Sequence, residues 1–357
     1  MRTTCLLWLW AGAVATAAPS VLAAQAAAPE GGVSTKATAA AAPRPPLRWP
    51  SDQDRVIARV HGEDVTFGDL VRHVKERHDP LFDRFVESPG GARCFTDDRY
   101  GTDWVRQYAD VRALMQHAAA EGRNPDGVEP HLSAALKEGF QTWLAQQSMP
   151  AEPSQRLIDH HLSHYQRYFG LRAEVRGWLD FLVGEDATEA ELRRFYHGNA
   201  RLFGGTVTFA HILVRHRDPI TLQQLGPKAR QGAWERIADL RARLAEDGSN
   251  FEDLAAEYSD DRQTGLRGGV FERVARFHPT LPAVLCRTAW RLDDGAVSDV
   301  VESPYGLHLV KRIDYLLRAT FLFTPAAYPE VQRYRRDTLQ EDLLFGLREK
   351  LRVKLLY

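Results

Sequence analysis

The sequence predicts an α+β protein in which one β-containing unit lies between mainly helical segments. Residues 131–147 and 232–248 place apolar side chains at helical spacing. Residues 206–216 are instead rich in β-branched side chains and alternate in the way that a strand does. The chain has 357 residues, of which 44% are hydrophobic, so it is long enough for two or three domains with cores of their own.

The N-terminal segment has the features of an export signal. Arg2 precedes an apolar run at 5–18, and small residues at Ala23 and Ala26 suit cleavage. We expect residues 1–26 to be a signal peptide that directs the protein to the periplasm or another extracytoplasmic compartment. An uncleaved N-terminal anchor is the alternative. No other run approaches membrane-spanning length, so we expect no stable membrane insertion after cleavage.

Composition then marks a linker and the start of the folded chain. Residues 27–53 are rich in Ala, Pro, Gly and Ser/Thr, which predicts a flexible linker. Residues 56–70 alternate apolar and polar side chains, turn, and alternate again, which predicts two short strands leading into a helix.

The formal net charge is −1, which argues against a general nucleic-acid binder.

Capping patterns predict where later helices begin. Thr188 and Glu191 have the spacing of a capping box, and so do Ser249 and Glu252. A long final helix is expected at 328–353.

The middle of the chain is expected to follow a β-α-α-β-β order. Its first strand is 206–216, and its closing strands are 297–301 and 305–313. After signal removal two cysteines remain, Cys94 and Cys286. They fit either one disulfide or two buried thiols, and no CxxC pair or metal-ligand set accompanies them.

Five ordered blocks carry a resemblance to a known family. They are residues 211–214 (HILV), 256–260 (AEYSD), 268–269 (GG), 292–298 (LDDGAVS) and 305–310 (YGLHLV). In this order and spacing they resemble the parvulin-type, or PpiC-like, peptidyl-prolyl cis-trans isomerases. The resemblance implies an antiparallel sheet flanked by helices over residues 204–315.

The flanking segments resemble the extracytoplasmic foldases of the SurA and PrsA type. By this resemblance residues 54–203 form a mostly helical N-terminal domain, and residues 316–357 supply a C-terminal helix that packs on it. The whole architecture is then a parvulin domain inserted into a SurA-like helical domain.

The family resemblance implies three catalytic residues, His211, Asp261 and His308. Strand alternation puts each histidine on a single face of its strand, and the two strands should be adjacent. Asp261 follows Ser259-Asp260, where parvulins carry Cys or Asp, which argues against an obligatory thiol nucleophile.

The same resemblance implies the substrate-binding residues. Leu281 and Leu285 stand where parvulins have a Met and a Phe, Trp290 stands where a later aromatic is common, and Ser303 is an outer member of the polar network. Two leucines keep the pocket apolar but lose the flat ring that stacks on proline.

These observations predict a cofactor-free isomerase that rotates X-Pro bonds without covalent catalysis. Its partners would be unfolded or nascent exported polypeptides that contain X-Pro. The alternative is an ATP-independent periplasmic holdase chaperone with a weak or inactive parvulin domain, and the altered pocket favours it.

Two further hypotheses have less support. His160, His161 and His164 could bind a metal, because residues 160 and 164 share a helix face, but no third ligand is marked. A hydrolase is disfavoured because the sequence has no GxSxG or equivalent nucleophile motif.

Overall fold

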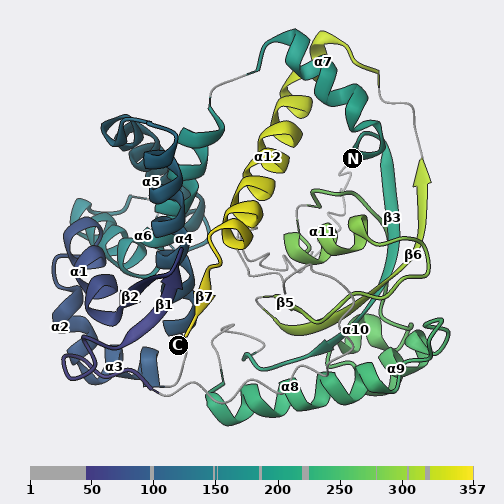
Figure 1. Ribbon diagram of the computed structural model, residues 1–357, viewed down its shortest axis with the longest axis horizontal. Coiled ribbons are helices and arrows are strands. Elements are labelled where there is room, and N and C mark those ends of the chain that lie inside the picture. The colour runs from purple at the N-terminus through teal and green to yellow at the C-terminus, as the bar shows by residue number, and fades with distance from the viewer. Residues whose placement is uncertain are drawn as a thin grey trace, which may run out of the picture.

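The molecule has two bodies, a helical unit and a β-containing unit (Figure 1). This computed structural model describes residues 46–96, 100–147, 149–150, 152–184, 187–218, 225–278, 280–303, 305–317 and 322–356. The expected signal peptide and the linker as far as residue 45 lie outside the described residues. Within these ranges, no helix has the length and apolar character needed to cross a membrane.

The helical unit begins with a β-hairpin and six helices. The hairpin consists of β1 (Val56–Val60) and β2 (Glu63–Thr66), which confirms the two short strands expected there. The helices are α1 (Phe67–Arg77), α2 (Phe82–Glu87), α3 (Pro89–Thr96), α4 (Gly101–Ala120), α5 (Glu129–Leu144) and α6 (Gln155–Val183), with a 3-10 turn at Pro125–Val128. Trp104 on α4 is 1% exposed and packs edge-on against Phe82, so aromatic rings fill this core.

The two ends of the described chain both join the helical unit. Strand β7 (Lys354–Leu355) pairs antiparallel with β1, giving a three-stranded sheet of order β2-β1-β7. Residues 46–53 do not behave as the expected linker, because Leu47 is only 1% exposed and Trp49 packs on Phe67. Burial of Leu47 outweighs the Pro-rich composition that predicted a tether.

Helix α12 (Tyr328–Lys350) connects the two bodies and corresponds to the expected final helix. Its C-terminal half buries Leu344 and Leu347 in the core of the helical unit. Its N-terminal half packs Val331 and Tyr334 against α7 (Glu189–Gly198). Short 3-10 turns at Ala200–Leu202 and Pro325–Ala327 lie beside this second contact.

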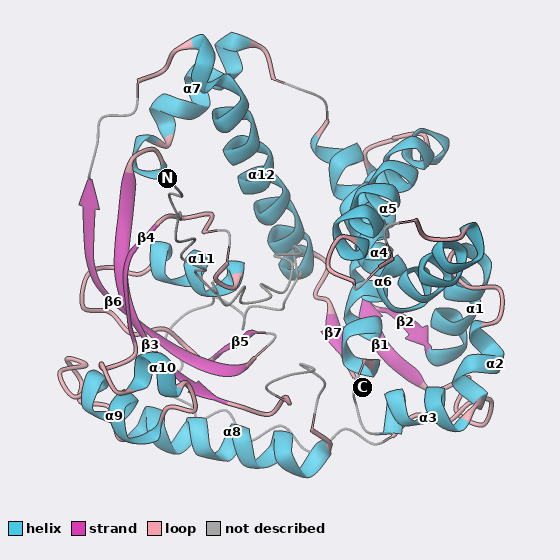
Figure 2. Ribbon diagram, turned by 180° about the vertical axis from the view of Figure 1, so that it is seen from behind, coloured by secondary structure: helices cyan, strands magenta, loops and turns pink. Residues whose placement is uncertain are grey.

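The β-containing unit is built on a four-stranded antiparallel sheet (Figure 2). A hydrophobic core lies on each face of this sheet. The strand order is β4-β3-β6-β5. Its elements are β3 (Gly205–Val214), α8 (Pro227–Ala242), α9 (Phe251–Tyr258), α10 (Arg262–Gly265), β4 (Val270–Val274), α11 (Ala283–Arg291), β5 (Val301–Ser303) and β6 (Gly306–Leu317). Even-numbered residues of β3 face α8 and α9, whereas Val207 and Phe209 face α11.

The observed elements differ from the expected β-α-α-β-β order. Strand β4 and helix α11 were not predicted. Of the stretch expected as a strand at 297–301, Val297 forms an isolated bridge with Lys311 and Val301 begins β5. The Thr188–Glu191 capping box is present. The one expected at Ser249 is wrong, because α9 begins after Asn250 with no side-chain cap.

The two cysteines do not form a disulfide. Cys94 lies in the core of the helical unit and Cys286 lies in the core beneath α11. Burial raises the pKa of the Cys286 thiol to about 11, which keeps it protonated.

Truncating α12 at its buried contact should destabilise the helical unit. We expect Leu344→Ala to lower the free energy of unfolding by about 2–5 kcal/mol, because Leu344 is 3% exposed and its removal leaves a cavity. Leu339→Ala, on the same helix at 36% exposure, should change it by about 0.5 kcal/mol or less. Urea denaturation of the full chain measures both, and equal effects would show that α12 is not anchored at Leu344.

Candidate functional site

Two histidines on adjacent strands form the centre of the site. His211 is on β3 and His308 is on β6, and Leu213 pairs directly with His308 in the antiparallel register. The two rings therefore meet diagonally on the face that α11 covers. They stack with their centroids 5.2 Å apart and their planes 19° apart.

A chain of hydrogen bonds runs through these rings to a residue on either side. His211 Nε2 is 3.0 Å from Asp261 Oδ2, and His211 Nδ1 is 3.1 Å from His308 Nδ1. His308 Nε2 is 2.6 Å from Ser303 Oγ. The structure thus brings together His211, Asp261, His308 and Ser303, which the sequence analysis had singled out. We call these four hydrogen-bonded residues the polar chain.

The chemistry of the groups assigns a direction to this chain. An ionised Asp261 can only accept, so His211 Nε2–H donates to it. A neutral His211 then accepts at Nδ1 from His308 Nδ1–H, which leaves His308 Nε2 to accept from the Ser303 hydroxyl. Each member has one defined role, and this tautomer assignment satisfies every ring nitrogen.

The loop after α9 holds Asp261 in place. Asp261 is the N-cap of α10, and its carboxylate accepts from the backbone N–H of Gln263 and from the Thr264 hydroxyl at 2.6 Å. Ser259 Oγ accepts from the backbone N–H of both Leu213 and Asp261, which fixes the loop to β3. The hydrogen bond from His211 is the main cause that holds the pKa of Asp261 far below its usual range.

Of the four hydrogen-bonded side chains, only one is open to solvent. His308 is 1% exposed and Ser303 is fully buried, whereas the Asp261 side chain is 19% exposed. Burial lowers the pKa of His308 well below its ordinary value, so this ring stays neutral. Asp261 is therefore the member that can reach a bound molecule, and the others orient it.

An aromatic ring that the sequence analysis missed borders the polar chain. Phe271 on β4 pairs with Phe209 on β3, and its ring centroid lies 5.0 Å from that of His211. This close approach needs Gly269, where φ is +75° and a Cβ would come within 2.1 Å of the His211 carbonyl oxygen. Phe271 is half-buried, so one part of its ring remains accessible.

The three expected apolar pocket residues occupy different environments. Leu281 is half-buried and packs on the same core as Phe271. Leu285 is 1% exposed and is part of that core, so it does not face solvent. Trp290 is half-buried and packs edge-on against Tyr315, 5.8 Å away. Phe271, Leu281 and Trp290 are therefore partly accessible, whereas Leu285 is buried in the core.

A buried carboxylate links the site to the helical unit. Glu302 directly precedes Ser303 on β5, and its carboxylate lies 3.5 Å from Arg106 on α4, 3.4 Å from His216 and 3.7 Å from Arg230. Burial raises the pKa of Glu302, but these partners more than offset it and hold the pKa well below the ordinary value. Adjacent residues of one short strand thus contact the polar chain and the neighbouring body.

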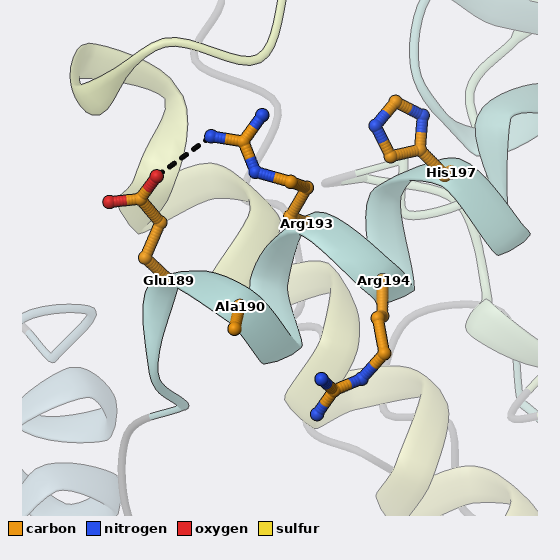
Figure 3. A pocket seen from close by; sticks show the side chains of 5 residues that line it. All are labelled: Glu189, Ala190, Arg193, Arg194 and His197. Atoms are coloured by element: carbon orange, nitrogen blue, oxygen red, sulfur yellow. Dashed lines mark hydrogen bonds and ion pairs between the residues drawn. The ribbon is translucent and has the colours of Figure 1, made fainter.

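Two other features lie apart from this site. A hollow of about 770 Å³ on α7 is lined by Glu189, Ala190, Arg193, Arg194 and His197, and contains none of the residues discussed above (Figure 3). His160 and His164 do not gain a third ligand within the described ranges, and the His164 ring stacks on Trp143 instead. The histidine cluster considered from the sequence is therefore not assembled as a metal site.

Known proteins match the segment that contains the polar chain. The PPIC-type PPIase domain family, also described as Rotamase, matches residues 211–314. The peptidyl-prolyl cis-trans isomerase Pin1 of Malus domestica is 30% identical over 118 residues, which cover 30% of this chain and 94% of that protein. The chain belongs to the PPIC-type peptidyl-prolyl isomerase family.

Other relatives of this PPIC-type protein are named as chaperones and foldases. The chaperone SurA of Aromatoleum aromaticum is 34% identical over 128 residues, which cover 36% of this chain and 27% of that protein. The matched segment thus spans about a quarter of that relative's length. The crystal structure of PrsA from Bacillus anthracis is 16% identical, has a TM-score of 0.27 and covers 70% of this chain and 98% of that one.

The neutral His308 should make the stability of the PPIC-type protein pH-dependent. Because its folded pKa lies below the ordinary value of about 6.5, the unfolded chain binds the proton first as pH falls. The contribution of neutral His308 to the free energy of unfolding is therefore complete above about pH 6.5 and is lost as the pH falls below it. We expect His308→Gln to reduce the slope of unfolding free energy between about pH 7 and pH 5.5, by up to about 1.4 kcal/mol per pH unit.

Urea denaturation at several pH values measures this slope. His160→Gln is the matched control, since His160 is exposed and should leave the slope as in the wild type. Identical slopes for wild type and His308→Gln would mean that His308 is not held neutral by the fold.

Proposed function

We propose that this protein is a peptidyl-prolyl cis-trans isomerase that acts on X-Pro bonds through Asp261. The observation that carries the proposal is the ordered chain from Ser303 through His308 and His211 to Asp261, which ends at solvent beside Phe271. Membership of the PPIC-type family supports the same reaction.

The reaction needs a site that binds the twisted amide better than the planar one. Rotation about the X-Pro bond has a barrier of roughly 18–20 kcal/mol because the planar amide is stabilised by resonance. Resonance places negative charge on the carbonyl oxygen, and twisting removes it. A fixed carboxylate near that oxygen repels the planar form more than the twisted form, so Asp261 lowers the barrier by differential binding.

The fixed hydrogen bonds keep Asp261 suited to this task. His211 and Thr264 hold its carboxylate ionised and oriented, while His308 and Ser303 hold His211. The two histidines and Ser303 are positioning residues, because burial keeps them from the substrate. No bond is broken in this reaction, so a nucleophile is not required.

The accessible apolar groups would bind the prolyl ring. Phe271 offers an aromatic face next to His211, and Leu281 extends the same surface over the core that contains Leu285. Removing the ring from water contributes roughly 25 cal/mol per Å² of apolar surface. The face of Phe271 replaces the flat ring whose loss from positions 281 and 285 was expected from the sequence.

We further propose that the substrates are unfolded or nascent exported polypeptides. The export signal expected at 1–26 and the likeness to a protein named as chaperone SurA support an extracytoplasmic location. In this proposal the helical domain is formed by residues 54–203 and 316–357, and the isomerase domain is formed by 204–315.

A holdase chaperone is the second candidate, and one feature of the helical unit favours it. Trp143 on α5 is half-buried among the rings of Phe140, His164, Tyr165 and Phe169. This aromatic surface lies in the helical unit and belongs to neither the polar chain nor its apolar border. Such surfaces bind aromatic side chains of unfolded polypeptides.

Exchange NMR on a short unphosphorylated X-Pro peptide tests the proposed activity. We expect wild-type protein to accelerate isomerisation and Asp261→Asn to lower kcat/KM by about 10–100-fold, a loss of about 1.4–2.7 kcal/mol in transition-state binding. Asp253→Asn, an exposed change on α9, should retain wild-type activity. Circular dichroism checks that each variant is folded.

Phe271, the aromatic residue beside His211, gives a separate prediction. Phe271→Ala should raise KM more than it lowers kcat, because it removes binding surface that planar and twisted forms share. Folded wild type with no acceleration, but with suppression of client aggregation that Trp143→Ala abolishes, would favour the holdase instead.

A further inference from the structure

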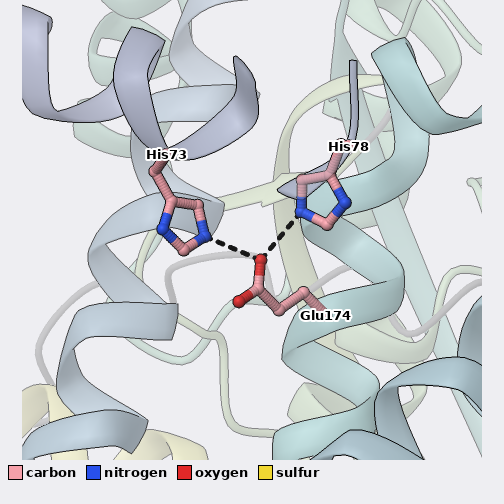
Figure 4. A group of neighbouring side chains, drawn as sticks. All are labelled: His73, His78 and Glu174. Atoms are coloured by element: carbon pink, nitrogen blue, oxygen red, sulfur yellow. Dashed lines mark hydrogen bonds and ion pairs between the residues drawn. The ribbon is translucent and has the colours of Figure 1, made fainter. Parts of the chain in front are cut away.

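A second cluster of titratable side chains lies in the helical unit, away from the polar chain. His73 on α1 and His78 at the end of α1 both point at Glu174 on α6 (Figure 4). His73 Nε2 and His78 Nε2 are each 2.8 Å from the same oxygen, Glu174 Oε2. All three potential ligand atoms lie within 4.8 Å of one another.

Two imidazoles and one carboxylate are a ligand set that binds transition metals. In protein zinc sites the Zn–N distance is about 2.0–2.1 Å and the Zn–O distance about 2.0–2.2 Å, so ligand atoms of a tetrahedron lie about 3.3 Å apart. To bind an ion, the two 2.8 Å contacts would open by about half an ångström, and the ring nitrogens, now within 4.8 Å of each other, would settle at about 3.3 Å. Nitrogen ligands disfavour Ca²⁺ and Mg²⁺, which prefer oxygen.

The fold positions these ligands before any ion binds. Gly170 on α6 leaves space for the His78 ring, because a Cβ there would lie 2.6 Å from His78 Cγ. The His73 ring packs against Tyr108 on α4, with the centroids 5.0 Å apart. Both rings therefore pack against neighbouring helices with their Nε2 atoms beside Glu174.

The protonation state of the cluster also suits a cation. Burial raises the pKa of Glu174, but the hydrogen bonds from His73 and His78 more than offset it and bring the pKa to about 2. The carboxylate is therefore ionised at neutral pH. Arg77 lies 3.7 Å from the other oxygen, Oε1, so it contacts the carboxylate oxygen that the two rings leave free.

We propose that His73, His78 and Glu174 bind one divalent transition-metal ion of the Zn²⁺ class and thereby join α1 to α6. Water completes the coordination, since the three side chains leave one tetrahedral position open. In the ion-free network each neutral ring carries its proton on Nε2. On binding, that proton resides on Nδ1 and Nε2 donates its lone pair to the metal, with no net release of protons from the neutral rings.

The ion has a route to the cluster. Glu174 is only 3% exposed at its side chain and His78 8%, but the His73 side chain is 15% exposed. The site is independent of the proposed isomerase activity, because none of its residues belongs to the polar chain.

Titration of the untagged, chelator-treated full chain with Zn²⁺ tests the proposal. We expect calorimetry to give one Zn²⁺ per chain, and His73→Gln/His78→Gln to weaken binding by more than about 100-fold, since even a residue that only supports a ligand costs about 10–100-fold. His160→Gln/His164→Gln is the matched control, because it removes two histidines at helical spacing elsewhere on α6 and should bind as the wild type does.

A second measurement keeps the test decisive if the double variant fails to fold. Co²⁺ added to wild-type protein should give the visible absorption of a tetrahedral site, and one equivalent of Zn²⁺ should abolish it. The single change His73→Gln, at the most exposed ligand, should lose that spectrum while circular dichroism stays unchanged. Absence of stoichiometric Zn²⁺ binding by the wild type, or equal binding by His73→Gln, would overturn the proposal and identify the cluster as a closed hydrogen-bonded triad.

Discussion

The antiparallel pairing of β3 with β6 is the constraint on which the rest of the β-containing unit depends. Its register places Leu213 opposite His308 and His211 opposite Val310, so both imidazoles fall on one face. The same register places Ile212 and Leu309 in the opposite core. A slip of one residue would exchange the two faces of a strand and bury a histidine among aliphatic side chains. The hydrophobic core on each side therefore specifies the polar chain between the strands.

Strand β5 extends this constraint to the other body. Its three residues are buried, and two successive side chains contact different partners, Ser303 the His308 ring and Glu302 the Arg106 guanidinium. A buried carboxylate surrounded by cations adds little net stability compared with an apolar contact, but it is costly to leave without partners. This arrangement thus favours one relative placement of α4 and the four-stranded sheet over others.

Local patterns predicted the elements whose causes are local. The Thr188 capping box and the first hairpin depend on residues within a few positions of one another, and both are present. Asn250 shows where such a pattern fails. Its side chain accepts from the backbone N–H of Ala245 and donates to the Arg243 carbonyl, so it closes the preceding turn and Ser249 does not cap the helix.

Contacts between distant segments could not be predicted in this way. The family resemblance predicted the residues His211, Asp261 and His308. Strand alternation predicted only that each of the two histidines faces one side of its strand. Phe271 required the pairing of β4 with β3, and β4 was not expected. The cluster of His73 and Glu174 joins residues 101 positions apart in sequence, and no spacing rule relates them.

The pairing of β7 with β1 has a consequence for the order in which the chain folds. The strand pairings of the β-containing unit lie within residues 205–317, so its sheet can form as soon as those residues have emerged during synthesis. The three-stranded sheet of the helical unit cannot close until Lys354 and Leu355 arrive, after nearly 300 further residues have followed β1. The N-terminal part of the helical unit therefore has an unpaired edge at β1 while the β-containing unit is synthesised and folds. Truncation of the last few residues during synthesis would leave a complete β-containing unit attached to an incomplete helical unit.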